Sequence, residues 1–257
     1  MENIALPNKI DFQKGEDANS GLVTIEPLYI GYGMTLGNSI RRVLLSSLPG
    51  AAVIGVKIKG ADHEFMALPN IKEDVLEIIL NLKELRLKVH TDEKVTLNLN
   101  VSGKKEVTAK DIKKNSDVEI INSDLRIAEI TEAKGNLEME IFVQSGRGYK
   151  LSATNDKKVK DLGYLEIDSV FSPVTEVSLK VENVRVGKMT NWDKLILDIT
   201  TDGTISVEEA FNHSVEILVN QFKSLLPKEV SGDKKKDKVK KNEKKETNTE
   251  EDKKDKK

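Results

Sequence analysis

The sequence has no cysteine, only one tryptophan, 4% aromatic residues and no long apolar run. Without cysteine, disulfide frameworks and thiolate metal sites are excluded, which is typical of proteins from a reducing compartment. A stretch of about 20 apolar residues, needed to cross a bilayer, is missing. Residues 1–10 also lack the basic and then apolar pattern of a secretion signal. We therefore expect a cytoplasmic protein without membrane contact.

Charge is unevenly distributed along the 257 residues. Residues 231–257 contain twelve Lys against four Asp and four Glu, so this segment carries +4 while the whole chain carries −2. The remaining part is thus acidic, which does not favour a surface for duplex DNA. With Val239 as its one large apolar residue, the segment cannot bury enough surface to fold. We predict a disordered, solvated tail, and any direct DNA contact would use it.

Groups that would support catalysis are scarce. Polymerising nucleotides needs clustered carboxylates around two metal ions, and the chain has no Asp-x-Asp-x-Asp cluster. The three histidines lie far apart in sequence and form no ligand pair. The adjacent acidic pairs do not resemble a metal cage. We therefore expect no catalytic residue, no metal and no cofactor. The histidines and acidic pairs are His63, His90, His213, Glu16-Asp17, Glu73-Asp74, Asp92-Glu93 and Glu208-Glu209.

The stretch from Thr35 to Gly50 predicts a helix over residues 36–48. Thr35 is a suitable N-cap, and Pro49-Gly50 would end the helix. At about 100° per residue, one apolar stripe forms and is predicted to be core. The stripe consists of Leu36, Ile40, Val43, Leu44, Ser47 and Leu48.

The opposite side of this helix combines positive charge with one apolar residue. Arg42 points away from the stripe, Asn38 and Leu45 share its side, and Arg41 lies at the flank. A leucine beside guanidinium groups indicates a partner surface. On periodicity alone, however, the simpler explanation is a solvated face with one exposed leucine.

A second long helix is predicted near the end of the folded part. Ser206 and Glu209 form a capping-box pair, and Pro227 marks the far end. Five apolar residues then follow the 4-3-4-3 spacing of helices that pack along their length. A single helix buried in a monomer would give the same pattern. The five residues are Phe211, Val215, Leu218, Phe222 and Leu225.

Most other periodic segments predict short strands, with one further helix around residues 75–82. Lys134-Gly135-Asn136 is interpreted as a hairpin turn. The chain therefore belongs to the α+β class, with a middle section that is mostly β. The predicted strands cover residues 22–28, 52–58, 95–99, 137–141, 177–181 and 195–199.

Several motifs, in order, resemble the amino-terminal domain of bacterial RNA polymerase alpha subunits. The likeness covers roughly residues 5–227. Five motifs in the family's order over that span are too many for a chance resemblance. The usual family member continues into a small helical domain that contacts promoter DNA, and this domain is absent here. The motifs are residues 26–50, Glu73 to Lys83, Gly146-Arg147-Gly148-Tyr149, Phe171-Ser172-Pro173-Val174 and Asp202-Gly203-Thr204-Ile205.

The resemblance implies a discontinuous dimerisation domain, residues 1–50 and 167–230, made of a sheet and two long helices. Residues 51–166 would form the inserted domain. The first and last helices would pack against their symmetry mates in a homodimer. The implied interface comprises Leu36, Ile40, Val43, Leu44, Phe211, Val215, Leu218, Phe222 and Leu225.

The resemblance also implies that the dimer receives the beta and beta-prime subunits, with omega and sigma in the holoenzyme. DNA would be contacted only through the complex, in the cytoplasm at the nucleoid or in an organelle such as a plastid. Asp168 falls on the implied beta-prime side. The implied beta contacts are Asn38, Arg41, Arg42, Leu45 and Lys83.

Two other functions remain open from the residues. The same helices could form a homodimeric scaffold for a different complex. Alternatively, the glycine-rich segment 31–37 could bind a phosphorylated ligand at a helix N-terminus. Its G-x-G-x-x-x-G spacing fits neither a P-loop nor a dinucleotide fingerprint, so a tight turn and close helix packing are favoured. The basic and aromatic turn at 146–149 is similarly interpreted as a hairpin or strand-end turn rather than a site for stacking on a base.

Overall fold

The computed structural model describes residues 4–152 and 163–226. They fall into two compact units, one up to Glu216 and one from Ile217, so the boundary lies within the last helix. The predicted disordered tail and the helix end at Pro227 lie outside the described residues. The α+β class is confirmed, because helices and antiparallel sheets are both present.

The described elements are as follows. The helices are α1 (Tyr32–Ser46), α2 (Val75–Lys83), α3 (Val207–Leu225) and the 3-10 helix η1 (Ala109–Asp111). The strands are β1 (Lys9–Lys14), β2 (Ser20–Leu28), β3 (Pro49–Ile58), β4 (Leu87–Val89), β5 (Val95–Ser102), β6 (Lys105–Thr108), β7 (Val118–Ile120), β8 (Arg126–Ile130), β9 (Asn136–Arg147), β10 (Tyr149–Lys150), β11 (Tyr164–Glu166), β12 (Ser169–Val170), β13 (Val174–Val186) and β14 (Met189–Thr201).

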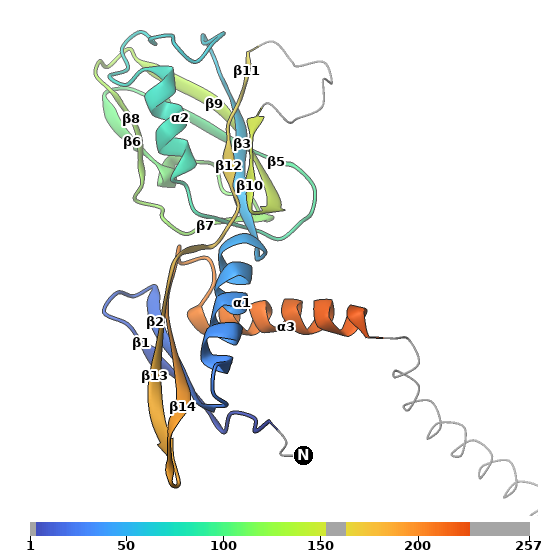
Figure 1. The fold of residues 1–257 in the computed structure, drawn as a ribbon. Helices are drawn as coiled ribbons and strands as arrows, with labels where there is room; N and C mark the ends of the chain where they lie inside the picture. Colours follow the sequence, from blue (N-terminus) through green and yellow to red (C-terminus); the bar gives the residue numbers. More distant parts are fainter. Residues whose placement is uncertain (1–3, 153–162, 227–257) are drawn as a thin grey trace, which may run out of the picture. The chain divides into compact units, whose positions relative to one another are not determined.

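One antiparallel sheet combines both ends of the folded sequence, in the order β1-β2-β14-β13. Figure 1 shows blue β2 beside orange β14, although they are far apart in the chain. Opposite residues in neighbouring antiparallel strands share a face, so Val23 and Leu197 lie on one apolar side. Helix α1 packs on this sheet through β13 and β14.

The second sheet, in the order β11-β3-β9-β5, contains only strands from the middle of the sequence. Its core includes Val56, Leu97 and Ile141, and α2 contributes four buried apolar residues. Asp74 caps α2 by accepting a hydrogen bond from the Glu77 backbone at 2.7 Å. Each of these two sheets lies within one of the two proposed domains, apart from β3, which begins at the boundary, whereas the two-stranded sheet of β10 and β12 joins both. The domain division itself stays a prediction.

The predicted start of α1 is wrong by four residues. The helix begins at Tyr32, and its N-cap is Gly31 with φ 84°, a left-handed conformation that glycine adopts readily. Thr35 lies inside the first turn, where its hydroxyl donates to the Gly31 carbonyl at 3.2 Å. Leu36 was predicted to be core but is 37% exposed, because Gly33 and Gly37 occupy the sheet-facing positions.

The turn at Lys134-Gly135-Asn136 does not join a hairpin. The preceding strand β8 pairs with β6, whereas the following strand β9 pairs with β3 and β5. The prediction failed because a turn signal does not specify which strands pair across it. The turn at 146–149 is confirmed as a strand end, since Gly148 separates β9 from β10.

The start of α3 agrees with its sequence signal. The Ser206 backbone donates to the Glu209 carboxylate, and the Glu209 backbone donates to the Ser206 hydroxyl, both at 3.2 Å. Phe211, one turn further on, packs edge-on against Phe12 of β1 with ring centroids 5.7 Å apart. The first half of α3 is therefore anchored on the sheet, and Phe211 is only 4% exposed.

Candidate protein interface

Helix α1 is fixed closely on the sheet by two glycines and a distant carboxylate. A Cβ on Gly37 would lie 2.4 Å from a Leu179 methyl carbon, so only glycine allows this approach without a shift. The Asp193 carboxylate of β14 accepts hydrogen bonds from the Gly31 and Gly33 backbones, each at 2.9 Å. The helix face opposite the sheet is thereby held in one orientation.

The same geometry bears on the phosphate alternative. A helix N-terminus attracts anions through its free N–H groups. Here the backbone N–H groups of Gly31 and Gly33 already donate hydrogen bonds to the Asp193 carboxylate. The expectation that the glycines serve a tight turn and close helix packing is confirmed by the φ of Gly31 and the contacts of Gly37.

The outward side of α1 is exposed, as the helical wheel predicts. Asn38, Arg41, Arg42 and Leu45 are all exposed. Within residues 4–152 and 163–226, neither arginine has an ion-pair partner. Arginine is enriched at interface hot spots, because its guanidinium can bind a carboxylate with two parallel hydrogen bonds. An unpaired arginine beside an exposed leucine therefore suits a protein interface.

Three of the predicted contact residues line one depression of about 400 Å³. Leu45 comes from α1, Lys83 from the end of α2, and Asp168 from the turn before β12. Sequence reasoning placed Asp168 on the opposite partner's side, but the structure brings it together with the other two. It also adds Arg86, which the sequence did not single out and which lies just before β4, three residues after Lys83.

The depression carries charges of both signs. The Ser152 backbone donates to the Asp168 carboxylate at 2.7 Å. This bond and the Ser152 side chain lower the pKa of Asp168, with smaller contributions from Tyr149 and Lys83. Burial raises the pKa of Tyr149, and the neighbouring Asp168 adds to that effect. Asp168 is therefore ionised at neutral pH, beside the positive Lys83.

The predicted dimer residues divide into three groups by exposure. Ile40, Leu44 and Phe211 are buried inside the chain, and we revise their assignment because they leave almost no surface for a second copy. Val43, Val215 and Leu218 are half-buried. Leu36, Phe222 and Leu225 are exposed, the last two by 60% and 78%.

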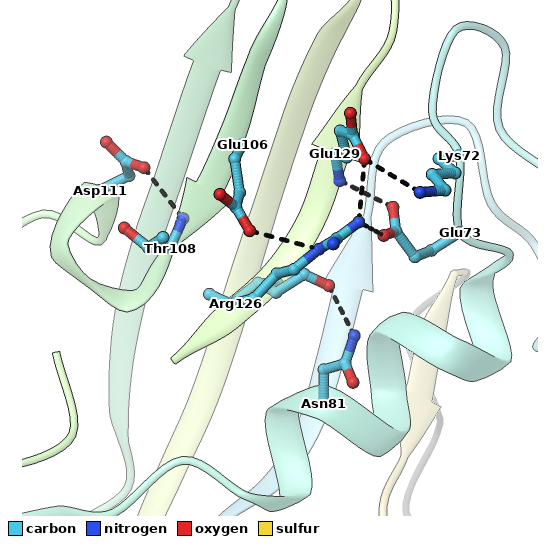
Figure 2. A network of polar contacts seen from close by, with 9 residues as sticks. Lys72, Glu73, Asn81, Glu106, Thr108, Asp111, Arg126 and Glu129 are labelled. Carbon is cyan, nitrogen blue, oxygen red and sulfur yellow. Dashed lines mark hydrogen bonds and ion pairs between the residues drawn. The ribbon is translucent and has the colours of Figure 1, made fainter. Parts of the chain in front are cut away.

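The acidic pair at the start of α2 has a structural role. The Glu73 side chain is 5% exposed and accepts hydrogen bonds from Arg126 at 2.6 Å and from the Glu129 backbone at 2.7 Å. Figure 2 shows Glu73 between these two partners. Arg126 also contacts the Glu129 side chain at 3.0 Å and Glu106 at 3.5 Å. This network ties α2 to β8, and sequence reasoning missed it because the partners are more than 50 residues apart.

Few groups suited to a metal come together. Among the described residues, no cluster of three or more His, Cys, Asp or Glu is placed to hold a metal ion. His90 and His213, far apart in sequence, do line one depression of about 370 Å³ together with Glu209. No described helix is long and apolar enough to cross a membrane.

The fold defines an α+β protein with an exposed basic and apolar helix face. The family model for the RNA polymerase Rpb3/RpoA insert domain matches residues 56–172. The DNA-directed RNA polymerase subunit alpha of Macrococcus caseolyticus is 46% identical over 222 residues, which are 86% of this chain and 70% of the relative. That of Carboxydothermus hydrogenoformans is 50% identical over 202 residues, 79% of this chain and 64% of the relative. The chain belongs to the family of bacterial DNA-directed RNA polymerase alpha subunits.

Proposed function

We propose that this chain is the assembly subunit of a DNA-dependent RNA polymerase, which homodimerises and provides the platform for the two largest subunits. The observation that carries the proposal is the identity of 46% to an alpha subunit across 86% of the chain.

We assign the outward face of α1 to the beta subunit. Asn38, Arg41 and Arg42 offer hydrogen-bond donors, and Leu45 offers an apolar anchor beside the depression that also contains Lys83. A face fixed to the sheet loses little conformational entropy on binding, which favours affinity. Asp168 opens onto the same depression, and we propose it as a contact on the beta-prime side.

The proposed dimer contact relies on apolar side chains that the single chain leaves exposed. On α3 these are Phe222 and Leu225, with half-buried Val215 and Leu218 before them. On α1 they are Leu36 and half-buried Val43. A twofold contact uses the same patch on both copies, so self-complementary apolar stripes are well suited to it.

The complex to which the family belongs is a nucleotidyltransferase, and we propose that this chain supplies none of its catalytic residues. Its partners would be a second copy and the beta and beta-prime subunits, with omega and sigma in the holoenzyme and DNA reached only through the complex. The complex would act in the cytoplasm, at the nucleoid. The second candidate is a homodimeric scaffold for a different assembly. Such a scaffold would use the same helix surfaces with unrelated partners.

The decisive measurement is the native mass of the complex that a tagged chain brings out of its host. Two copies together with two very large subunits would support the polymerase assignment. A dimer with other partners would favour the second candidate, and a bare dimer would leave only the generic scaffold supported.

Arg42→Ala tests the assignment of the α1 face. We expect the dimer to fold with an unchanged melting temperature and to recover the beta subunit at least tenfold less well, as expected for loss of an interface hot spot of about 2 kcal/mol. Lys104→Ala, at an exposed site before β6, is the matched control and should recover it normally. Unfolding of the Arg42 variant would contradict the exposed assignment.

A further inference from the structure

A half-enclosed cavity in the inserted section lies apart from every surface assigned above. It has a volume of about 660 Å³, within the range of roughly 300–1,000 Å³ that is typical of binding pockets. It is formed around η1, the turn before β7, and β7 itself. None of its lining residues belongs to α1, α2 or α3.

The floor of the cavity is aliphatic. Leu97, Ala109, Ile112 and Val118 line it and are each buried to more than nine-tenths. Half-buried Ile120 lies beside them. Such a floor accepts an apolar side chain and offers little to a strongly hydrated ligand.

The rim is basic. Lys110, Lys113 and Lys114 line it, against the single carboxylate of Glu119. Lys110 forms an ion pair with Asp124. Within the described part of the chain, Lys113 and Lys114 have no acidic partner, and the hydroxyl of Ser123 makes no hydrogen bond. Two free ammonium groups and a free hydroxyl therefore border an apolar floor.

We propose that this cavity binds an acidic peptide segment of a protein partner, with an apolar side chain on the floor and carboxylates against Lys113 and Lys114. Charge complementarity favours an anionic occupant. Apart from the imidazole of His90, the described lining contains no ring on which a base could stack, which disfavours a nucleic-acid strand. The chain's own segment 231–257 carries +4 and would be repelled.

The test uses the full-length dimer and a fluorescein-labelled peptide of alternating aspartate and phenylalanine, measured by fluorescence anisotropy. We expect saturable binding that weakens as salt is added. A peptide with alanine in place of phenylalanine should bind more weakly, because it leaves the floor empty. A peptide with lysine in place of aspartate should not bind.

The variant Lys113→Glu/Lys114→Glu reverses the free charges and should weaken the acidic peptide at least about tenfold, because like charges then face each other. Lys104→Glu/Lys134→Glu changes the net charge equally at exposed sites outside the cavity and should change binding less than about twofold. Unchanged thermal unfolding of both variants shows that the fold is kept.

Three results would overturn the proposal. The first is the absence of saturable binding. The second is an equal loss in both double variants, which would show that only overall charge matters. The third is strong binding of sodium decanoate without binding of the peptide, which would assign the cavity to a small amphiphile. None of these results depends on the polymerase assignment.

Discussion

Oδ2 of Asp193 in β14 lies 2.9 Å from the backbone nitrogen of Gly33 in α1, and the two residues are 160 positions apart in the chain. The same oxygen accepts from Gly31. A negative group at a helix N-terminus satisfies free N–H groups and complements the helix dipole. The cap of α1 is therefore supplied by tertiary structure.

Asp193→Ala should lower the free energy of unfolding by about 1–3 kcal/mol, because the buried N–H of Gly33 and the partly buried N–H of Gly31 lose their acceptor. Asp198→Ala is the matched control, since Asp198 lies on the same strand, is exposed, and makes no side-chain hydrogen bond within residues 4–152 and 163–226. Urea unfolding followed by circular dichroism measures both. Equal midpoints for the two variants would refute the importance of the cap.

Glu73→Ala should destabilise the inserted section by about 1–3 kcal/mol, since the partly buried N–H of Glu129 is left without its acceptor. Glu106→Ala removes another carboxylate that faces Arg126, but one whose side chain is 58% exposed. We expect no measurable change from this control, as is usual for surface pairs. Thermal unfolding separates the two, and a similar cost for both would contradict the network.

The capping box of α3 predicts a dependence on pH. Hydrogen bonds from the backbone and side chain of Ser206 lower the pKa of Glu209. A lowered folded-state pKa contributes stability that is present above the unfolded value of about 4.3 and is lost as the pH falls through the folded value. The contribution is thus complete at neutral pH.

Ser206→Ala should therefore cost about 1 kcal/mol at pH 7 through loss of the cap, and less at pH 3. The pKa of Glu209, followed by NMR of its carboxyl carbon, should rise in the variant. Asn212→Ala, at an exposed site on the same helix, should leave that pKa in place. A cost that does not change with pH would show that Glu209 takes no part.

Phe222→Asp should dissociate the dimer, because it places a charge in the proposed apolar contact of α3. Asn220→Asp introduces the same charge at a neighbouring exposed position outside the apolar stripe. Sedimentation velocity over a range of concentrations should give monomers for the first variant and dimers for the second. Persistence of the dimer in both would remove α3 from the interface.

Features with local signals could be predicted from the sequence. Ser206 and Glu209 lie three residues apart, so their capping box is visible in the sequence and is present in the structure. The exposure of Arg42 follows from helical periodicity alone. The strands alternate apolar and polar residues, and most of the predicted segments lie inside longer observed strands.

Features that depend on distant residues could not be predicted. Thr35 looked like the N-cap of α1, but Asp193 supplies the acceptor. Leu36 looked like core, whereas the sheet requires the smaller Gly37 at the point of contact. A helical periodicity scores glycine as neither apolar nor polar. It therefore cannot show where the backbone of a helix packs directly against a sheet. Asp168 and Leu45 likewise share a depression only because distant segments meet there.

The pairing of β2 with β14 sets an order of folding during synthesis. Residues 49–166 contain every strand of the second sheet, so that sheet can form before β14 has left the ribosome. Until then β2 has only β1 as a partner, α1 lacks its cap, and the apolar side bearing Val23 is uncovered. The first strand and helix to be translated are thus among the last to reach their native contacts, which makes the nascent chain most vulnerable to aggregation at its own beginning.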